Sequence, residues 1–127
     1  MDDSIRHALT QSRIIDMTTT GARTGQPRRI EIVAHVIDGH TYISGVPSRR
    51  TRAWIRNLQA DPNLTFHLKG PGPNADIPAV ARIVTAEPER RAILTEVARA
   101  WRRTDVDVMV EYSPLIEVTF PGLADTA

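Results

Sequence analysis

Residues 16–29 combine hydroxyl groups, glycines and guanidinium groups in one short stretch. Its threonines, glycines and arginines are Thr18, Thr19, Thr20, Thr24, Gly21, Gly25, Arg23, Arg28 and Arg29. Glycine lets backbone N–H groups come close to a ligand, and arginine offers a planar charged fork that matches phosphate or carboxylate oxygens. The Walker phosphate-loop pattern is absent. The stretch is therefore a candidate anion site, and a solvated surface turn is the alternative interpretation.

Trp54 and Asn57 form a second pair with chemical potential. They are three residues apart in a predicted helix, residues 51–61, so they share one helix face. In one interpretation the indole packs in the core and the amide bridges backbone groups. In the other, the indole is a flat wall beside a ligand ring and the amide hydrogen-bonds to that ring. The spacing alone leaves both open.

Several common chemistries have no support in the sequence. The chain has no cysteine, which excludes thiol catalysis, disulfides and thiolate metal sites. The histidines, His7, His35, His40 and His67, show no metal-ligand spacing, so we expect no metal and place each histidine at the surface or half-buried in a strand. No Gly-x-Ser-x-Gly motif is present to support an α/β-hydrolase triad.

The composition is that of one globular domain. The chain has 127 residues, of which 41% are hydrophobic and 24% charged, enough for a single core. A net charge of +1 gives no overall attraction to nucleic acid. The first half nevertheless gathers arginines: Arg23, Arg28, Arg29, Arg49, Arg50, Arg52 and Arg56. Without a signal-like start or an apolar run near the roughly 20 residues of a membrane span, we expect a cytoplasmic protein with no integral membrane segment.

The elements that position these residues follow from periodicity and turn signals. Alternating apolar residues predict strands, and an Asp38–Gly39 pair between two of them predicts a tight hairpin. The predicted strands are 13–17, 30–37, 41–45, 64–68, 79–85 and 115–120, and the predicted helices are 4–11, 51–61 and 87–103. Residues 106–112 fit a helical turn or an edge strand. We therefore expect one domain over 1–127, mainly β with α, with a helix within 1–12 and a tail at 121–127. Its architecture would be a small barrel of about six mostly antiparallel strands with about three peripheral helices.

Three motifs, in this order and spacing, resemble those of the deazaflavin (F420)-dependent nitroreductase family of flavin/deazaflavin oxidoreductases. They are Thr-Thr-Thr-Gly-Ala-Arg-Thr-Gly-Gln-Pro-Arg at 18–28, Asp-Gly at 38–39, and Trp-Ile-Arg-Asn-Leu-Gln-Ala-Asp-Pro at 54–62. The match covers roughly residues 14–69, more than half of the chain. The resemblance implies a split β-barrel, coenzyme F420 as cofactor and a homodimer.

The resemblance also implies roles for individual residues. The F420 phosphate would lie at the threonine-glycine turn, and the deazaflavin ring beside the tryptophan-asparagine helix and the loop before it. The residues matched to these cofactor contacts are Arg23, Thr24, Gln26, Arg28, Ser44, Gly45, Ser48, Arg49, Arg50, Trp54 and Asn57. Arg49 or Arg50 would replace a lysine that the family carries in this loop, and Tyr112 is the candidate for the substrate pocket.

The resulting hypothesis is an enzyme that passes a hydride from reduced F420 to a small-molecule substrate. Family substrates are quinones, nitroaromatics and other activated double bonds, and the cofactor carries most of the chemistry, which accounts for the missing catalytic dyad. Two alternatives stay open: an FMN-binding oxidoreductase on the same fold, and a non-catalytic split barrel that binds a flavin or another small ligand.

Overall fold

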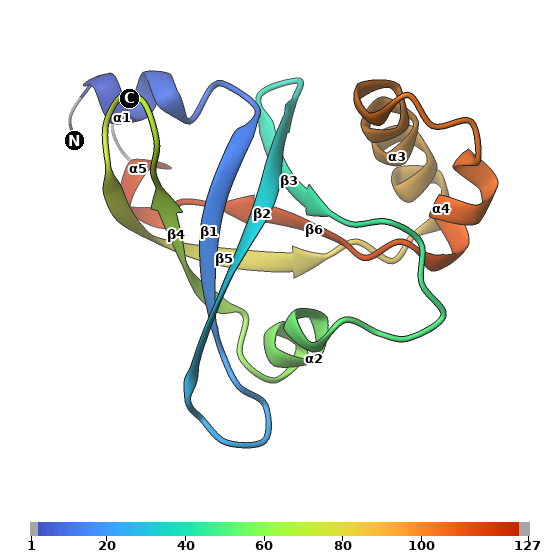
Figure 1. Ribbon diagram of the computed structural model, residues 1–127, viewed down its shortest axis with the longest axis horizontal. Coiled ribbons are helices and arrows are strands. Elements are labelled where there is room, and N and C mark those ends of the chain that lie inside the picture. Colours follow the sequence, from blue (N-terminus) through green and yellow to red (C-terminus); the bar gives the residue numbers. More distant parts are fainter. Residues whose placement is uncertain (1–2, 125–127) are drawn as a thin grey trace.

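Six strands form a closed antiparallel barrel. The computed structural model describes residues 3–124. Its strands are β1 (Arg13–Thr20), β2 (Pro27–Ile37), β3 (His40–Ser44), β4 (Asn63–Leu68), β5 (Ala75–Ile83) and β6 (Leu115–Thr119). Their order around the barrel is β1-β2-β3-β6-β5-β4, and β4 pairs with β1 to close it (Figure 1). The predicted barrel of about six antiparallel strands is confirmed.

Five helices accompany the strands in the described residues, against about three predicted. They are α1 (Asp3–Ala8), α2 (Ala53–Ala60), α3 (Glu87–Trp101), α4 (Val106–Tyr112) and α5 (Pro121–Ala124). The ambiguous segment 106–112 is helical because its buried residues, Met109 and Val110, pack against the apolar face of α3. The predicted tail begins with the short α5, and its last three residues lie outside the described part. The first helix, predicted at 4–11, ends at Ala8 in the structure. Residues 1–2 of the predicted 1–12 segment also lie outside the described part.

The candidate turn is narrower than the sequence predicts, because the strands on either side of it are longer. β1 continues through Thr20, and Thr18 and Thr19 pair with Arg29 and Arg28 of β2. Threonine is β-branched and fits a paired strand well. The turn proper is therefore residues 21–26, with the threonines extending the strand that leads into it.

The other predicted turn is confirmed, and one strand begins earlier than predicted. Asp38 and Gly39 have φ values of 51° and 79°, as a primed two-residue hairpin requires. β5 begins at Ala75, so Pro78 lies inside it and pairs with Thr65 of β4. Pairing of β5 with β6 starts only at Val80, which leaves Pro78 at an edge position on that side, where a missing N–H is tolerated.

Two apolar clusters hold the elements together. The larger fills the barrel and includes Trp54, Ile55 and Leu58, so α2 closes one end of it, beside the turn between β1 and β2 (Figure 1). The smaller joins α3 and α4 to the barrel wall around Tyr42 and Leu115. Burial of these side chains is the main force that fixes the helices on the barrel. Within residues 3–124, no helix combines the length and apolar character that crossing a membrane requires.

Candidate cofactor site

The turn between β1 and β2 is a compact, internally bonded loop. The Gly21 N–H donates to the Gln26 carbonyl at 2.8 Å, and the Gly25 N–H donates to the Gly21 carbonyl at 2.9 Å. Gly25 has a φ of 71°, which favours glycine. A Cβ at Gly21 would lie 2.9 Å from Thr24 Oγ1 and 3.2 Å from the Gln26 carbonyl oxygen, too close for an unchanged turn. Both glycines are therefore required by the geometry of the loop.

Asn57 of α2 holds this turn in place. Its Oδ1 accepts a hydrogen bond from the Ala22 N–H at 2.9 Å, and its Nδ2 donates to Thr19 Oγ1 at 3.0 Å. Asn57 and Thr19 are 7% and 3% exposed. Of the two interpretations of Asn57, the structure has the amide bridging to the backbone. The same side chain also lines a cavity, so Asn57 both holds the turn and forms part of the candidate site.

A cavity of about 580 Å³ lies between the turn and α2, and we call it the turn pocket. It is lined by Thr19, Gly21, Ala22, Arg23, Thr24, Arg28, Ile30, Ala53, Trp54 and Asn57. Two guanidinium groups and no carboxylate line it. Arg28 donates to Thr24 Oγ1 at 3.4 Å, and Arg23 has no ion pair among residues 3–124. The third arginine of the stretch, Arg29, instead pairs with Asp16 at 2.9 Å. The lining of the turn pocket thus combines two guanidinium groups with the apolar side chains of Trp54 and Ile30.

A second cavity, of about 380 Å³, lies across α2 from the first, and we call it the arginine pocket. It is lined by Ser48, Arg49, Arg50, Thr51, Arg52, Ile55, Gln59, Ile83, Val84, Thr85, Arg90, Glu111, Tyr112, Ser113, Pro114 and Leu115. The lining thus contains four guanidinium groups and one carboxylate, that of Glu111. Since Trp54 and Asn57 line the turn pocket whereas Ile55 and Gln59 line the arginine pocket, α2 is the partition between the two cavities.

The candidate cofactor residues divide between the two cavities. Those at the turn pocket are Arg23, Thr24, Arg28, Trp54 and Asn57, and those at the arginine pocket are Ser48, Arg49 and Arg50, together with Tyr112. Arg49 lies over the Tyr112 ring, 5.2 Å from its centroid. Three candidates line neither cavity. Gln26 joins the turn through its backbone, the buried Ser44 hydroxyl donates to the Pro114 carbonyl at 2.6 Å, and Gly45 is packed between Arg52 and Pro114.

Arg90 was missed by the sequence analysis. Its guanidinium donates to four carbonyl oxygens near the C-terminal ends of α4 and β5. They belong to Val110 at 2.8 Å, Val84 at 3.0 Å, Met109 at 3.3 Å and Ser113 at 2.6 Å. Burial lowers the pKa of Arg90 because the charged form loses hydration. The signal was in the sequence, since Arg90 falls in line with Leu94 and Val97 on the apolar stripe of α3.

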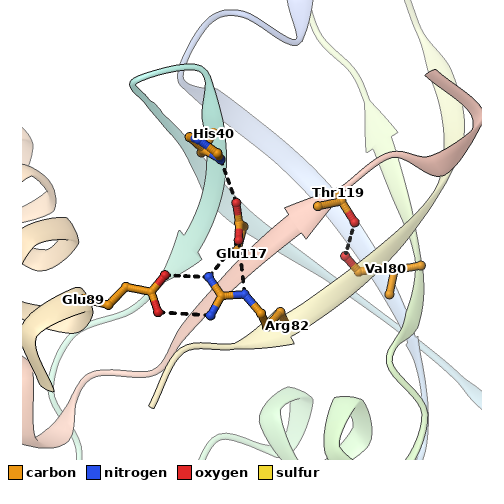
Figure 2. Close-up of polar contacts among 6 residues, drawn as sticks. All are labelled: His40, Val80, Arg82, Glu89, Glu117 and Thr119. Atoms are coloured by element: carbon orange, nitrogen blue, oxygen red, sulfur yellow. Dashed lines mark hydrogen bonds and ion pairs between the residues drawn. The ribbon is translucent and has the colours of Figure 1, made fainter. Parts of the chain in front are cut away.

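An ion-pair network fixes α3 to the barrel beside Arg90. Arg82 of β5 donates to both Glu89 oxygens, at 3.0 and 2.6 Å, and to Glu117 of β6, which also bonds His40 of β3 at 2.8 Å (Figure 2). The bonds to Glu89 and then Glu117 raise the pKa of Arg82. Burial raises the pKa of Glu117, but the bonds from Arg82 and His40 outweigh it, so that pKa is lowered. Arg82, Glu89 and Glu117 therefore stay ionised at neutral pH, and their ion pairs anchor the helix that carries Arg90.

Two histidines are more buried than predicted. His35 is 4% exposed and stacks edge-on against Trp101, with ring centroids 5.2 Å apart, because α3 covers this part of β2. The buried His67 is bonded on both sides, to Thr18 Oγ1 and to Asp76 Oδ1, each at 2.7 Å. The bond with His67 lowers the pKa of Asp76. No cluster of potential metal ligands occurs in the part of the chain that the structure describes.

Solved structures share the barrel. A conserved hypothetical protein from Mycobacterium tuberculosis is 22% identical, with a TM-score of 0.69 over 94% of this chain and 80% of that chain. The F420-H2 dependent reductase FDR-A is 22% identical, with a TM-score of 0.59 over 84% of this chain and 93% of its own. A domain-swapped dimer is 20% identical, with a TM-score of 0.58 over 84% and 79%. At these identities the likeness shows the fold.

Sequence comparison identifies the family. No curated protein matches the chain. The sequence model of a family described as F420H(2)-dependent quinone reductase matches residues 2–113, which include the turn, α2 and most of the arginine pocket. The resemblance to F420-using oxidoreductases is confirmed at this level. The chain belongs to the F420H(2)-dependent quinone reductase family, a family of oxidoreductase enzymes.

Proposed function

We propose that this protein binds coenzyme F420 at the turn pocket and transfers a hydride from reduced F420 to a quinone, a nitroaromatic or another activated double bond. The observation that carries the proposal is the turn pocket itself. It joins two guanidinium groups, no carboxylate and an apolar aromatic wall in one cavity of about 580 Å³. Family membership supports the same cofactor.

The donor groups of the turn pocket fit a phosphate. Arg23 and Arg28 are exposed, permanently charged and free of ion pairs within residues 3–124, so binding an anion breaks no existing pair. The absence of a side chain at Gly21 keeps the loop tight, and both arginines line the cavity that this loop borders. Fork-shaped guanidinium groups bind phosphate oxygens strongly because both partners are charged. These residues would hold the phosphate of F420.

The apolar part of the lining fits a planar ring. Trp54 and Ile30 give an apolar surface, and Asn57 keeps the turn at a fixed distance from α2. A preformed cavity of this kind positions a cofactor and excludes water from one face of it.

When bound and reduced, F420 supplies a hydride, so two electrons leave the cofactor and reduce the substrate. Reduction of a quinone to a hydroquinone consumes one further proton, which solvent can supply. The protein's contribution is then orientation, charge and a dry pocket. Tyr112 lines the other cavity, and we assign no proton transfer to it.

The first test is a fluorescence and thermal-shift titration with F420, FMN and FAD side by side. We expect selective stabilisation by F420, because a ligand that binds only the folded state raises stability by mass action. A preference for FMN would replace the proposed cofactor while leaving the fold unchanged. No response to any of the three would contradict the proposal.

The second test uses one charge reversal and its control. Arg28→Glu replaces one of the two guanidinium groups in the lining of the turn pocket by a carboxylate and should weaken F420 binding at least about tenfold. Arg56→Glu is the matched control, because Arg56 is an exposed arginine of α2 that lines neither cavity. Tight F420 binding by the Arg28 variant would refute the site. A homodimer stays a prediction, which light scattering of the purified protein checks.

A further inference from the structure

Residues 45–52, which we call the α2 loop, form no helix or strand. They run from β3 past the end of α4 to α2, the helix that carries Trp54 and Asn57 (Figure 1). Such a segment lacks the repeating backbone hydrogen bonds that fix a helix or a strand. The position of the α2 loop therefore depends on the contacts that it makes with other parts of the chain.

The α2 loop is held against the segment between α4 and β6. The Ser48 N–H donates to the Tyr112 carbonyl at 3.2 Å, and Arg49 lies over the Tyr112 ring. Directly before the loop, the Ser44 hydroxyl donates to the Pro114 carbonyl at 2.6 Å. Both the backbone and the side chain of Tyr112 thus contact the loop, so a displacement of Tyr112 would displace the loop as well.

Arg90 of α3 fixes the same segment from its own helix. Its half-buried guanidinium donates to the carbonyls of Met109, Val110 and Ser113, at the end of α4 and just beyond it. It also donates to the carbonyl of Val84, directly after β5. The last carbonyls of a helix lack N–H partners within the helix, and the helix dipole favours a cation there. One planar group therefore ties together α3, the end of α4 and the end of β5.

We propose that Arg90 is a positioning residue, which holds the last turn of α4 and thereby sets the position of Tyr112 and, through it, of the α2 loop. Arg90 acts through backbone carbonyls in this role, and no contact with a ligand is required. Because the α2 loop leads into the helix that carries Trp54 and Asn57, loss of Arg90 should also disturb the turn pocket. Only this last consequence rests on the proposed function.

Arg91, the next residue of α3, is the matched control. It also joins α3 to α4, through an ion pair with Asp107 at 2.7 Å, but that pair lies in the first turn of α4. An exposed ion pair of this kind contributes little to stability. If any link between the two helices were sufficient, the two arginines would be equivalent. If the position of the last turn matters, only Arg90 affects Tyr112.

Fluorine NMR of protein labelled with fluorotyrosine tests the proposal directly, because Tyr42 and Tyr112 are the only tyrosines of the chain. In Arg90→Ala the Tyr112 signal should move toward that of the unfolded chain. Tyr42 packs in the smaller apolar cluster with α3, so its signal should stay if α3 remains docked. Arg91→Ala should leave both signals unchanged. An unmoved Tyr112 signal in Arg90→Ala, equal shifts of both signals, or the same shift in Arg91→Ala would each overturn the proposal.

Arg90→Lys keeps the charge and serves if the alanine variant does not fold. Its Tyr112 signal should move in the same direction, because one ammonium group cannot reach four carbonyls as a planar guanidinium does. A parent-like signal in Arg90→Lys would contradict the geometric argument.

Chemical rescue separates positioning from lost stability. Ethylguanidinium at millimolar concentration fits the space left in Arg90→Ala and should return the Tyr112 signal to its position in the parent. A signal that does not recover would assign the effect to lost stability and overturn the proposal. In the same samples, F420 affinity should fall about fivefold in Arg90→Ala, recover with ethylguanidinium and stay unchanged in Arg91→Ala. A parent that does not bind F420 would refute the proposed function, whereas the fluorine signals would still decide the role of Arg90.

Discussion

Replacing Asn57 by alanine would separate α2 from the turn that it braces. The substitution removes two hydrogen bonds, from the Ala22 N–H to Oδ1 and from Nδ2 to Thr19 Oγ1. Each contributes about 1 kcal/mol net, and about 1 kcal/mol more is lost because Thr19 Oγ1 stays buried without this partner. Ala22 is exposed, so water can replace the amide there. We therefore expect a loss of about 2–3 kcal/mol in the free energy of unfolding.

Urea unfolding and thermal melting measure this loss, and a fall in Tm of about 6–12 °C corresponds to it in a domain of this size. Thr19→Val is the matched control, since it removes only the buried bond and should cost about half as much. F420 affinity should fall with Asn57→Ala and less with Thr19→Val, because the second variant keeps the bond to the turn. An Asn57→Ala variant that is as stable as the parent but no longer binds F420 would refute the bracing role and make Asn57 a direct ligand.

Two further predictions concern backbone geometry and pH. Gly21→Ala should destabilise the protein by about 1–3 kcal/mol and weaken F420 binding, because the new Cβ would lie too close to Thr24 Oγ1. An unchanged Tm and an unchanged F420 affinity would contradict the view that the turn has no room for a side chain at this position. Burial lowers the pKa of His35 below 6.5, so the unfolded chain binds the proton more readily and stability falls as pH drops from about 6.5 toward the lowered value. In that window stability should fall as pH drops, and His35→Phe should remove the fall. Equal pH slopes for the two proteins, in urea unfolding at pH 5.5 and 7.5, would contradict the assignment.

Local patterns were sufficient for much of the barrel. Alternating apolar residues located the six strands, and the Asp38–Gly39 pair specified a hairpin through the positive φ values that both residues adopt. These features depend on the pleat of a strand and the sterics of a turn, which neighbouring residues decide by themselves. The strand ends depend on pairing instead, so the extension of β1 through Thr20 required its partner β2.

The candidate site shows the same division. Residue types alone nominated Arg23, Arg28, Trp54 and Asn57, and the structure gathers them around one cavity. Only the tertiary structure placed the 48–50 loop at the arginine pocket, on the other side of α2 from the turn pocket. Sequence spacing does not say which face of α2 a neighbouring loop packs against.

Arg90 and Ser113 illustrate the limit most clearly. Arg90 gives only an indirect signal, as a charge on the apolar stripe of a helix, and Ser113 follows a helix and belongs to no motif. The sequence by itself determined a cationic, glycine-shaped turn on an antiparallel barrel of the F420 family. The tertiary structure decided that Arg90 of α3 and Ser113, which follows α4, line a second cavity, because burial depends on which distant segments pack together.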